Sequence, residues 1–229
     1  MSDAESPKGH AVRYIVIGQI SFAIFIGVCV ALHPGIVLKW NEGGVSNYGI
    51  HIKTAIPYTL ALSLLALYSL RAAASLSRSD RLARQLRRLL IAYSVIVIVM
   101  LFSTYVYTLN HVLRDIHIGF GTVLITFQAF ASMWMFSLFR RRLDGAFLVT
   151  QLSGSILALI TILGLWHFLF LAEELANTGF ACLLIHASQE IVDEEDVKVA
   201  TAPKRPSLVL LRSKLTPIRA EQSPDRLSS

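Results

Sequence analysis

Five long apolar runs, separated by short polar gaps, constrain this chain more than any other feature of its sequence. The runs cover residues 14–32, 56–70, 89–107, 116–139 and 147–171. A helix needs about 20 mostly apolar residues to cross the hydrocarbon core of a bilayer. The chain has 229 residues, 54% of them hydrophobic, and a soluble core of this size has no room for five such helices. The sequence therefore predicts an all-α, multi-pass membrane protein.

A sixth stretch, at 175–192, is less apolar than the others. Its polar members include Asn177, His186, Gln189 and Glu190. Polar groups within a span usually face the interior of the helix bundle. We therefore expect a sixth helix that is buried among the other five. Glu173 and Glu174 then fall in the gap before this helix, where we expect them to be solvated.

The distribution of Lys and Arg predicts the orientation of the bundle. Basic residues gather in the N-terminal lead and in the second and fourth gaps: Arg71, Arg78, Arg81, Arg84, Arg87, Arg88 and Arg140 to Arg142. Basic segments beside spans stay in the cytoplasm. The basic tail is expected to be cytoplasmic as well, which requires an even number of spans. The prediction is a polar lead at 1–12, a six-helix domain at 13–192 and a disordered cytoplasmic tail at 193–229.

The formal net charge of +6 does not indicate a nucleic-acid partner, because the arginines flank the spans. Anionic lipid headgroups are the nearer partner for basic residues in that position. We therefore expect contact with membrane lipids, and with a partner protein in the membrane, but none with nucleic acid. The expected location is the plasma membrane, with the N-terminus in the cytoplasm.

The remaining gaps are poor in basic residues and form a polar rim on the predicted outer face. The candidate ligand-binding residues are Glu42, Ser46, Asn47, His111, Asp115 and His117. Because these polar residues gather on one side only, we expect them to shape a pocket that contacts lipid or a partner protein. This interpretation predicts no catalytic residue and no cofactor.

The same rim supports an alternative, a zinc-dependent hydrolase of lipid amide or ester bonds. Its metal ligands would be His51, His111, Asp115 and His117. Three His and a carboxylate suit a catalytic zinc ion with an open position for water. The chain has no HExxH or HxxxH pair, so the ligands would come singly from different helices. Channel function is a further class that the sequence leaves open.

The turn Val45-Ser46-Asn47-Tyr48-Gly49 after the first helix resembles that of the six-span DUF998 family and of the related Frag1/DRAM/Sfk1 group. The resemblance implies a membrane protein without established catalysis, linked to lipid organisation, with Ser46 and Gly49 as matching positions. A more distant likeness is to the seven-span hydrolases that include alkaline ceramidases. That likeness would use Ser46, Asp115, His51, His111, His117 and His186, but the HxxxH pair and the seventh helix are missing.

Overall fold

A computed structural model describes residues 9–38, 44–77, 80–139, 142–165 and 168–201. The chain divides into two compact units, Met1–Glu195 and Asp196–Ser229. The helices described below belong to the first unit, except for the last turns of α8, which belong to the second.

The described residues form helices joined by turns and contain no strand. The helices are α1 (Gly9–Leu32), α2 (Gly35–Leu38), α3 (Asn47–Ile50), α4 (Ala55–Ser75), α5 (Arg81–Val106), α6 (His111–Phe139), α7 (Arg142–Ile162) and α8 (Leu169–Thr201). By length and composition, six of them can cross a membrane, which are all except the short α2 and α3. This result confirms the predicted all-α bundle of six candidate spans.

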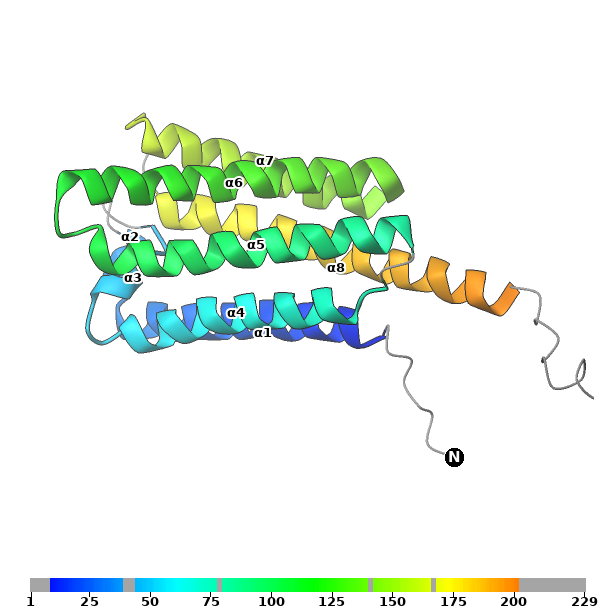
Figure 1. Cartoon of the computed structure of the whole chain (residues 1–229). Coiled ribbons are helices and arrows are strands. Elements are labelled where there is room, and N and C mark those ends of the chain that lie inside the picture. Colours follow the sequence, from blue (N-terminus) through cyan, green and yellow to red (C-terminus); the bar gives the residue numbers. More distant parts are fainter. Residues whose placement is uncertain (1–8, 39–43, 78–79, 140–141, 166–167, 202–229) are drawn as a thin grey trace, which may run out of the picture. The chain divides into compact units, whose positions relative to one another are not determined.

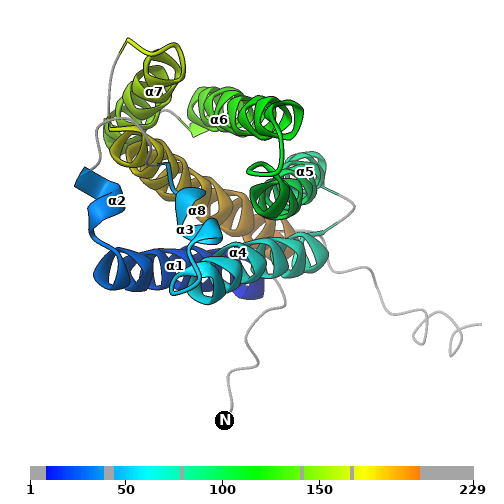
Figure 2. The same cartoon turned by 90° about the vertical axis from the view of Figure 1, so that its left-hand side faces the viewer.

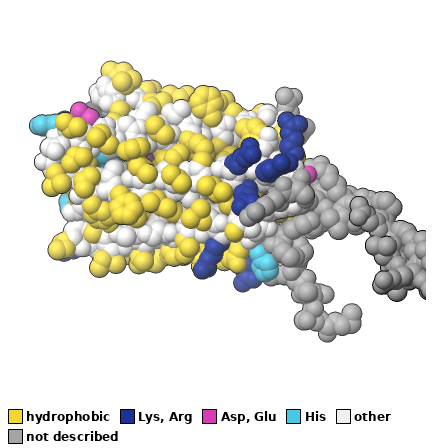
Figure 3. Space-filling view, viewed as in Figure 1, with side chains coloured by type: hydrophobic (Ala, Val, Ile, Leu, Met, Phe, Trp, Pro, Cys, Tyr) yellow, Lys and Arg dark blue, Asp and Glu magenta, His cyan; other side chains and the backbone are white. Residues whose placement is uncertain are grey.

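The outside of the bundle is apolar, as a lipid environment requires. Phe102, Phe130 and Val149 are 68%, 65% and 64% exposed, and hydrophobic side chains cover the face seen in Figure 3. Monomeric soluble proteins rarely expose large contiguous apolar patches, because water penalises them. The six apolar helices and this exterior are those of an integral, multi-pass membrane protein.

The arginine-rich second gap is largely helical rather than a loop. α5 begins at Arg81, and the side chain of Asp80 caps it by accepting hydrogen bonds from Leu82 N at 2.9 Å and Ala83 N at 3.1 Å. An aspartate in this position satisfies backbone N–H groups that the first helical turn leaves unpaired. Four of the basic residues therefore belong to the start of the third span instead of preceding it: Arg81, Arg84, Arg87 and Arg88.

The fifth run does not extend to residue 171 as expected, because α7 ends at Ile162. Gly164 has a φ of +75°, and its backbone N–H donates to Thr161 O at 2.9 Å. The N–H of Leu165 donates to Ile160 O at 3.1 Å, which closes the helix in the manner of a glycine C-cap. The run of apolar residues is continuous, but the helix is not.

The sixth helix is longer than expected at both ends. It begins at Leu169, so the gap that was expected to hold Glu173 and Glu174 is instead the first part of α8. It continues to Thr201, past residue 193 where the disordered tail was expected to begin. No Pro or Gly lies between Gly179 and Pro203, so nothing in the sequence interrupts the helix there. The rest of the predicted tail, 202–229, lies outside the described residues.

Within the first unit, α8 lies at the centre of the bundle. Figures 1 and 2 show it between the pair α1 and α4 and the pair α6 and α7, beside α5. Phe180, Leu183 and Leu184 of this helix are buried in the main hydrophobic core. The central position of α8 explains why a helix with many polar residues fits among five apolar ones.

α7 and α8 approach each other closely through two glycines. A Cβ on Gly154 would lie 2.7 Å from Ala172 O and would also collide with Ala176 N. A Cβ on Gly179 would lie 2.6 Å from Phe147 O. Small residues allow this backbone-to-backbone packing between membrane helices.

The two ends of the bundle differ in charge. The starts of α1, α5 and α7 share one end, and Figure 3 shows Lys and Arg side chains gathered there. We call it the arginine-rich end. The opposite end carries α2, α3 and the α5–α6 and α7–α8 turns, and we call it the α3 end.

Candidate functional site

Residues 44–49 form a turn that leads into α3, and this turn packs tightly at the α3 end because two of its residues are glycines. A Cβ on Gly44 would come within 3.1 Å of a carboxyl oxygen of Glu173. A Cβ on Gly49 would lie 2.8 Å from the Tyr58 ring and would collide with Thr104. Glycine at both positions therefore lets this turn contact α4, α5 and α8 directly.

A backbone group of the turn holds a glutamate of the central helix. The N–H of Val45 donates to Oε2 of Glu173 at 2.6 Å, across 128 residues of chain. The turn itself is closed by hydrogen bonds from Asn47 N to Gly44 O at 3.0 Å and from Gly49 N to Ser46 O at 3.0 Å. At 2.6 Å this hydrogen bond is at the short end of the normal range, and it fixes the turn over the start of α8.

A second layer of contacts joins the turn to α5 and α6. The hydroxyl of Tyr107 donates to Oδ1 of Asn47 at 2.6 Å. The Tyr107 ring stacks on the His117 ring, with centroids 4.7 Å apart. His117 is buried, and its Nδ1 lies 2.8 Å from the Ser103 hydroxyl. The turn, α5 and α6 are thus joined by one continuous set of contacts.

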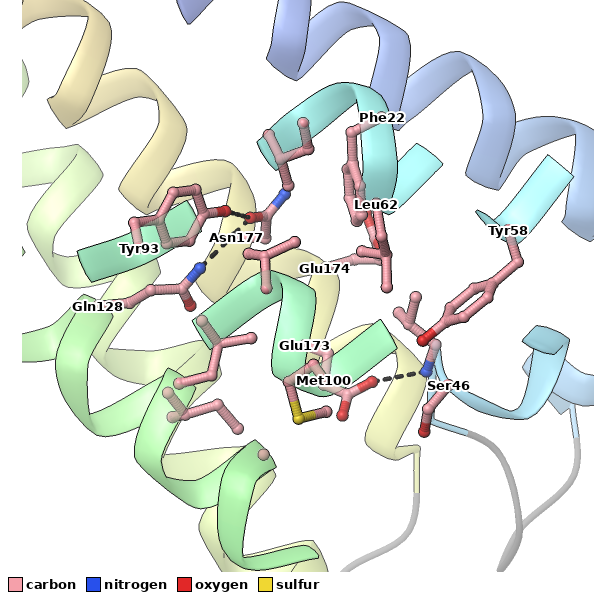
Figure 4. A pocket seen from close by; sticks show the side chains of 16 residues that line it. Phe22, Ser46, Tyr58, Leu62, Tyr93, Met100, Gln128, Glu173, Glu174 and Asn177 are labelled. Carbon is pink, nitrogen blue, oxygen red and sulfur yellow. Dashed lines mark hydrogen bonds between the residues drawn. The ribbon is translucent and has the colours of Figure 1, made fainter. Parts of the chain in front are cut away.

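An inner cavity of about 90 Å³ lies beneath the turn, between α1, α4, α5, α6 and α8. Figure 4 shows its aromatic wall, with Phe22 from α1, Tyr58 from α4 and Tyr93 from α5. On its polar side, Asn177 Oδ1 lies 3.4 Å from both the Tyr93 hydroxyl and the Gln128 amide nitrogen. The cavity is therefore apolar on one side and polar on the other.

Both Glu173 and Glu174 line this cavity (Figure 4). None of the described residues that line it is Lys, Arg or His. One carboxyl oxygen, Oε1 of Glu174, is buried and has no hydrogen-bond partner among the described residues. Buried charged groups are normally paired or bind a ligand. The cavity therefore presents two acidic groups without a basic counterpart.

A larger outer chamber, of about 550 Å³, lies next to the inner cavity. The two share the lining residues Ser46, Met100, Gly121, Ile125 and Glu173. The chamber is also lined by residues of α6 and α7 and by Arg114, His51 and His117. The shared wall makes the two cavities parts of one site that begins at the α3 end.

Three of the predicted ligand-binding residues come together at this site. Ser46 lines both cavities, and Asn47 and His117 line the outer chamber. His111 and Asp115 instead lie on the surface, where the Asp115 side chain is 73% exposed. Glu42 lies outside the described residues.

The four predicted metal ligands do not form one cluster. His51 lies against His33, with ring centroids 4.6 Å apart, whereas His117 contacts Ser103 and Tyr107. Across the described ranges, no group of three or more His, Cys, Asp or Glu side chains has the geometry to hold a metal ion.

Glu173 and Glu174 lie in a different element from the one that the sequence predicts. They were expected to be solvated in a gap, but they are part of α8 and line the inner cavity, where both are half-buried. The signal that could have found them is Gly164, because a glycine after an apolar run often ends a helix. An end there would have moved both glutamates into the next helix.

The turn also perturbs two tyrosines outside the spans or at their edge. Burial raises the pKa of Tyr48 to about 12, and the nearby Cys29 and Glu174 add to the shift. Burial likewise raises the pKa of Tyr107 above its ordinary value. Both phenols therefore stay neutral at physiological pH and act as hydrogen-bonding or packing groups.

A separate polar cluster lies at the arginine-rich end. Nδ1 of His186 in α8 lies 2.6 Å from Oδ1 of Asp144, which is buried in the first turn of α7. Nε2 of the same ring lies 3.9 Å from Oε1 of Glu190. This cluster joins α7 to α8 and lines neither of the two cavities.

Comparison of the chain with family models, with curated proteins and with solved structures finds no match. The site is therefore interpreted from its own chemistry.

Proposed function

We propose that this multi-pass membrane protein is a non-enzymatic binding protein whose inner cavity takes a positively charged ammonium group. The observation that supports this most directly is the pair Glu173 and Glu174, which line a small cavity without a basic residue among its described lining. A ligand cation supplies the missing opposite charge, and it gives Oε1 of Glu174 a partner.

The aromatic wall of the cavity supports a cation of the organic ammonium class. Phe22, Tyr58 and Tyr93 line the same space as the two glutamates. The face of an aromatic ring attracts a cation, and rings of this kind recognise quaternary ammonium groups in many proteins. An alkylated ammonium also fits the apolar side better than a strongly hydrated metal ion does.

We further propose that the α3 end faces away from the cytoplasm, in the plasma membrane. The basic residues at the other end support this orientation through the positive-inside rule. The ligand would then enter the outer chamber from the non-cytoplasmic side. Membership of the DUF998 or Frag1/DRAM/Sfk1 group is a further proposal, supported by the Val45-to-Gly49 turn that covers the cavity.

The test uses purified full-length protein in dodecylmaltoside and follows its thermal unfolding with choline or ethanolamine. A ligand present at 100 times its dissociation constant stabilises the folded state by about 2.7 kcal/mol. We expect choline to raise the melting temperature of the wild-type protein. The uncharged isostere 3,3-dimethylbutan-1-ol is expected to have no such effect.

Two variants complete the test. Glu174→Gln keeps the size of the side chain and removes its charge, so choline should no longer stabilise the protein. Asp115→Asn removes an exposed carboxylate at the same end and should leave the choline effect intact. An equal response to choline and its uncharged isostere, or an undiminished response in Glu174→Gln, contradicts the proposal.

A further inference from the structure

The lining of the outer chamber contains a cationic side chain, which the described lining of the inner cavity lacks. Arg114, His51 and His117 line the chamber, whereas Glu173 on the shared wall is its only acidic residue among those described. The inner cavity has two acidic residues and no basic one among its described lining. A ligand that reaches from the chamber into the inner cavity would therefore meet first an arginine and then two glutamates.

Arg114 is placed to bind an anion in the chamber. Its side chain is 54% exposed, and the contact between its Nε and Oδ1 of Asp115 is 3.9 Å long. Exposed ion pairs of this kind contribute little energy, so an incoming anion can compete for the guanidinium. Guanidinium groups bind phosphate oxygens through two parallel hydrogen bonds.

The shared wall contains a glycine at a position where a large side chain would narrow the space between the two cavities. Gly121 lines both, and the nearest atom to a Cβ built there is Met100 Cε at 3.8 Å. A small side chain would fit at this position, but a large one would project into the passage. The absence of a side chain therefore leaves room for a ligand that occupies both cavities.

We propose that the site binds a phosphoammonium zwitterion, with its phosphate at Arg114 in the outer chamber and its ammonium at Glu173 and Glu174 in the inner cavity. This inference rests on the proposed function and adds the anionic half of the ligand. The chemistry is shared by the headgroup of a phospholipid and by a water-soluble phosphodiester of choline.

The chamber walls also have apolar residues at the right place for a lipid. Ile118 of α6 and Ile162 of α7 line the chamber, and they are 41% and 37% exposed. A lipid whose headgroup enters between these helices can leave its acyl chains in the bilayer. A soluble phosphodiester makes no use of this apolar edge.

The experiment compares binding of choline, glycerophosphocholine and dihexanoylphosphatidylcholine to the full-length protein in dodecylmaltoside by isothermal titration calorimetry. A hydrogen bond to a charged group contributes about 1.5–3 kcal/mol. We therefore expect glycerophosphocholine to bind about 10- to 100-fold more tightly than choline. Tighter binding of the short-chain lipid than of glycerophosphocholine identifies a lipid ligand, and equal affinity identifies a soluble one.

Three variants test the assignment of the two halves. In Arg114→Gln the ratio of glycerophosphocholine affinity to choline affinity should fall to about one. Lys53→Gln removes an exposed cation at the same end that lines neither cavity, and it should keep the wild-type ratio. Gly121→Leu should weaken binding of glycerophosphocholine at least about tenfold by blocking the passage.

The outcomes separate this inference from the function on which it rests. If choline binds but glycerophosphocholine binds no more tightly, the zwitterion site is overturned and the ammonium site stands. An affinity ratio in Arg114→Gln that equals the wild-type ratio also overturns the role of Arg114. If none of the three probes binds, both proposals are wrong.

Discussion

Gly49 allows the turn to lie over the cavity because it has no side chain. A Cβ at this position would meet Tyr58 at 2.8 Å and would collide with Thr104, and neither neighbour is a flexible side-chain end. Overpacking of this kind usually costs about 1–3 kcal/mol. We expect Gly49→Ala to lower the free energy of unfolding by that amount, measured by SDS titration in mixed micelles.

The matched control is Gly27→Ala in α1, where no atom lies within 4 Å of the added Cβ. Alanine favours a helix over glycine by about 1 kcal/mol, so this variant should be neutral or more stable than the wild type. Equal losses in the two variants would show that the turn does not pack on Tyr58 and Thr104.

Tyr48 leads to a prediction about alkaline pH. Its hydroxyl is buried and has no hydrogen-bond partner among the described residues, and its pKa is raised to about 12. A phenol with a raised pKa in the folded state favours folding below the unfolded pKa of about 10. That contribution is lost as the pH rises from about 10 to about 12.

We expect Tyr48→Phe to be neutral or up to about 1 kcal/mol more stable at pH 7.5, because it removes an unpaired buried hydroxyl. Between pH 10 and 12 it should lose less stability than the wild type does. Thermal unfolding across this pH range measures both effects. A destabilised Phe variant would mean that the hydroxyl has a partner.

The sequence identified polar residues of the site on the turn and α6, but not those of α8. Ser46, Asn47 and His117 could be predicted because polar residues between apolar runs stand out. Gly164 could have placed Glu173 and Glu174 in the last helix, but their position at the cavity could not be predicted, because it depends on which helix becomes central. Burial of a carboxylate is a property of packing among several helices, and local composition does not encode it.

The contact between α7 and α8 depends on glycine at the element scale. A Cβ on Gly154 would lie 2.7 Å from Ala172 O and would collide with Ala176 N, so the two backbones would have to separate. We expect Gly154→Leu to cost at least about 3 kcal/mol, or to prevent folding. Size-exclusion profiles of a fluorescent fusion in detergent report the loss. Gly119→Leu, at an open position on α6, should keep the wild-type profile.

Asp144 and His186 hold the same two helices together at the other end. The carboxylate is buried and lies 2.6 Å from the imidazole, so Asp144→Ala leaves a polar ring without this partner. We expect a loss of about 1–3 kcal/mol by SDS titration. Asp115→Ala, at an exposed carboxylate, should stay within about 0.5 kcal/mol of the wild type. Similar losses in both variants would contradict a structural role for the buried pair.

Helix existence was easier to predict than helix ends in this chain. Each apolar run is long enough to specify a helix by itself. The end of α7 depends on Gly164 adopting a φ of +75°, and the start of α5 depends on the Asp80 cap. Each of these helix ends depends on one or two residues, and the hydrophobicity of the surrounding sequence gives no sign of it. The same limit explains why the sixth span was expected to be too short.

At the scale of the whole molecule, the unequal ends of the bundle predict its orientation in the membrane. The arginine-rich end should face the cytoplasm, so single cysteines at the two ends should differ in accessibility. The starting protein would have Cys29 and Cys182 replaced by Ala. In intact cells, a membrane-impermeant maleimide should label Leu109→Cys, which lies beside the α5–α6 turn.

Ala74→Cys, near the end of α4, should react only after the cells are lysed. Ser229→Cys should behave in the same way, because six spans return the tail to the side of the N-terminus. Labelling of Ser229→Cys in intact cells while Ala74→Cys stays protected would leave an odd number of crossings, so one of the six helices would not span. Labelling of Ala74→Cys but not Leu109→Cys would reverse the orientation. The site formed by the outer chamber and the inner cavity would then open to the cytoplasm, and its ligand would come from the inner leaflet or the cytosol.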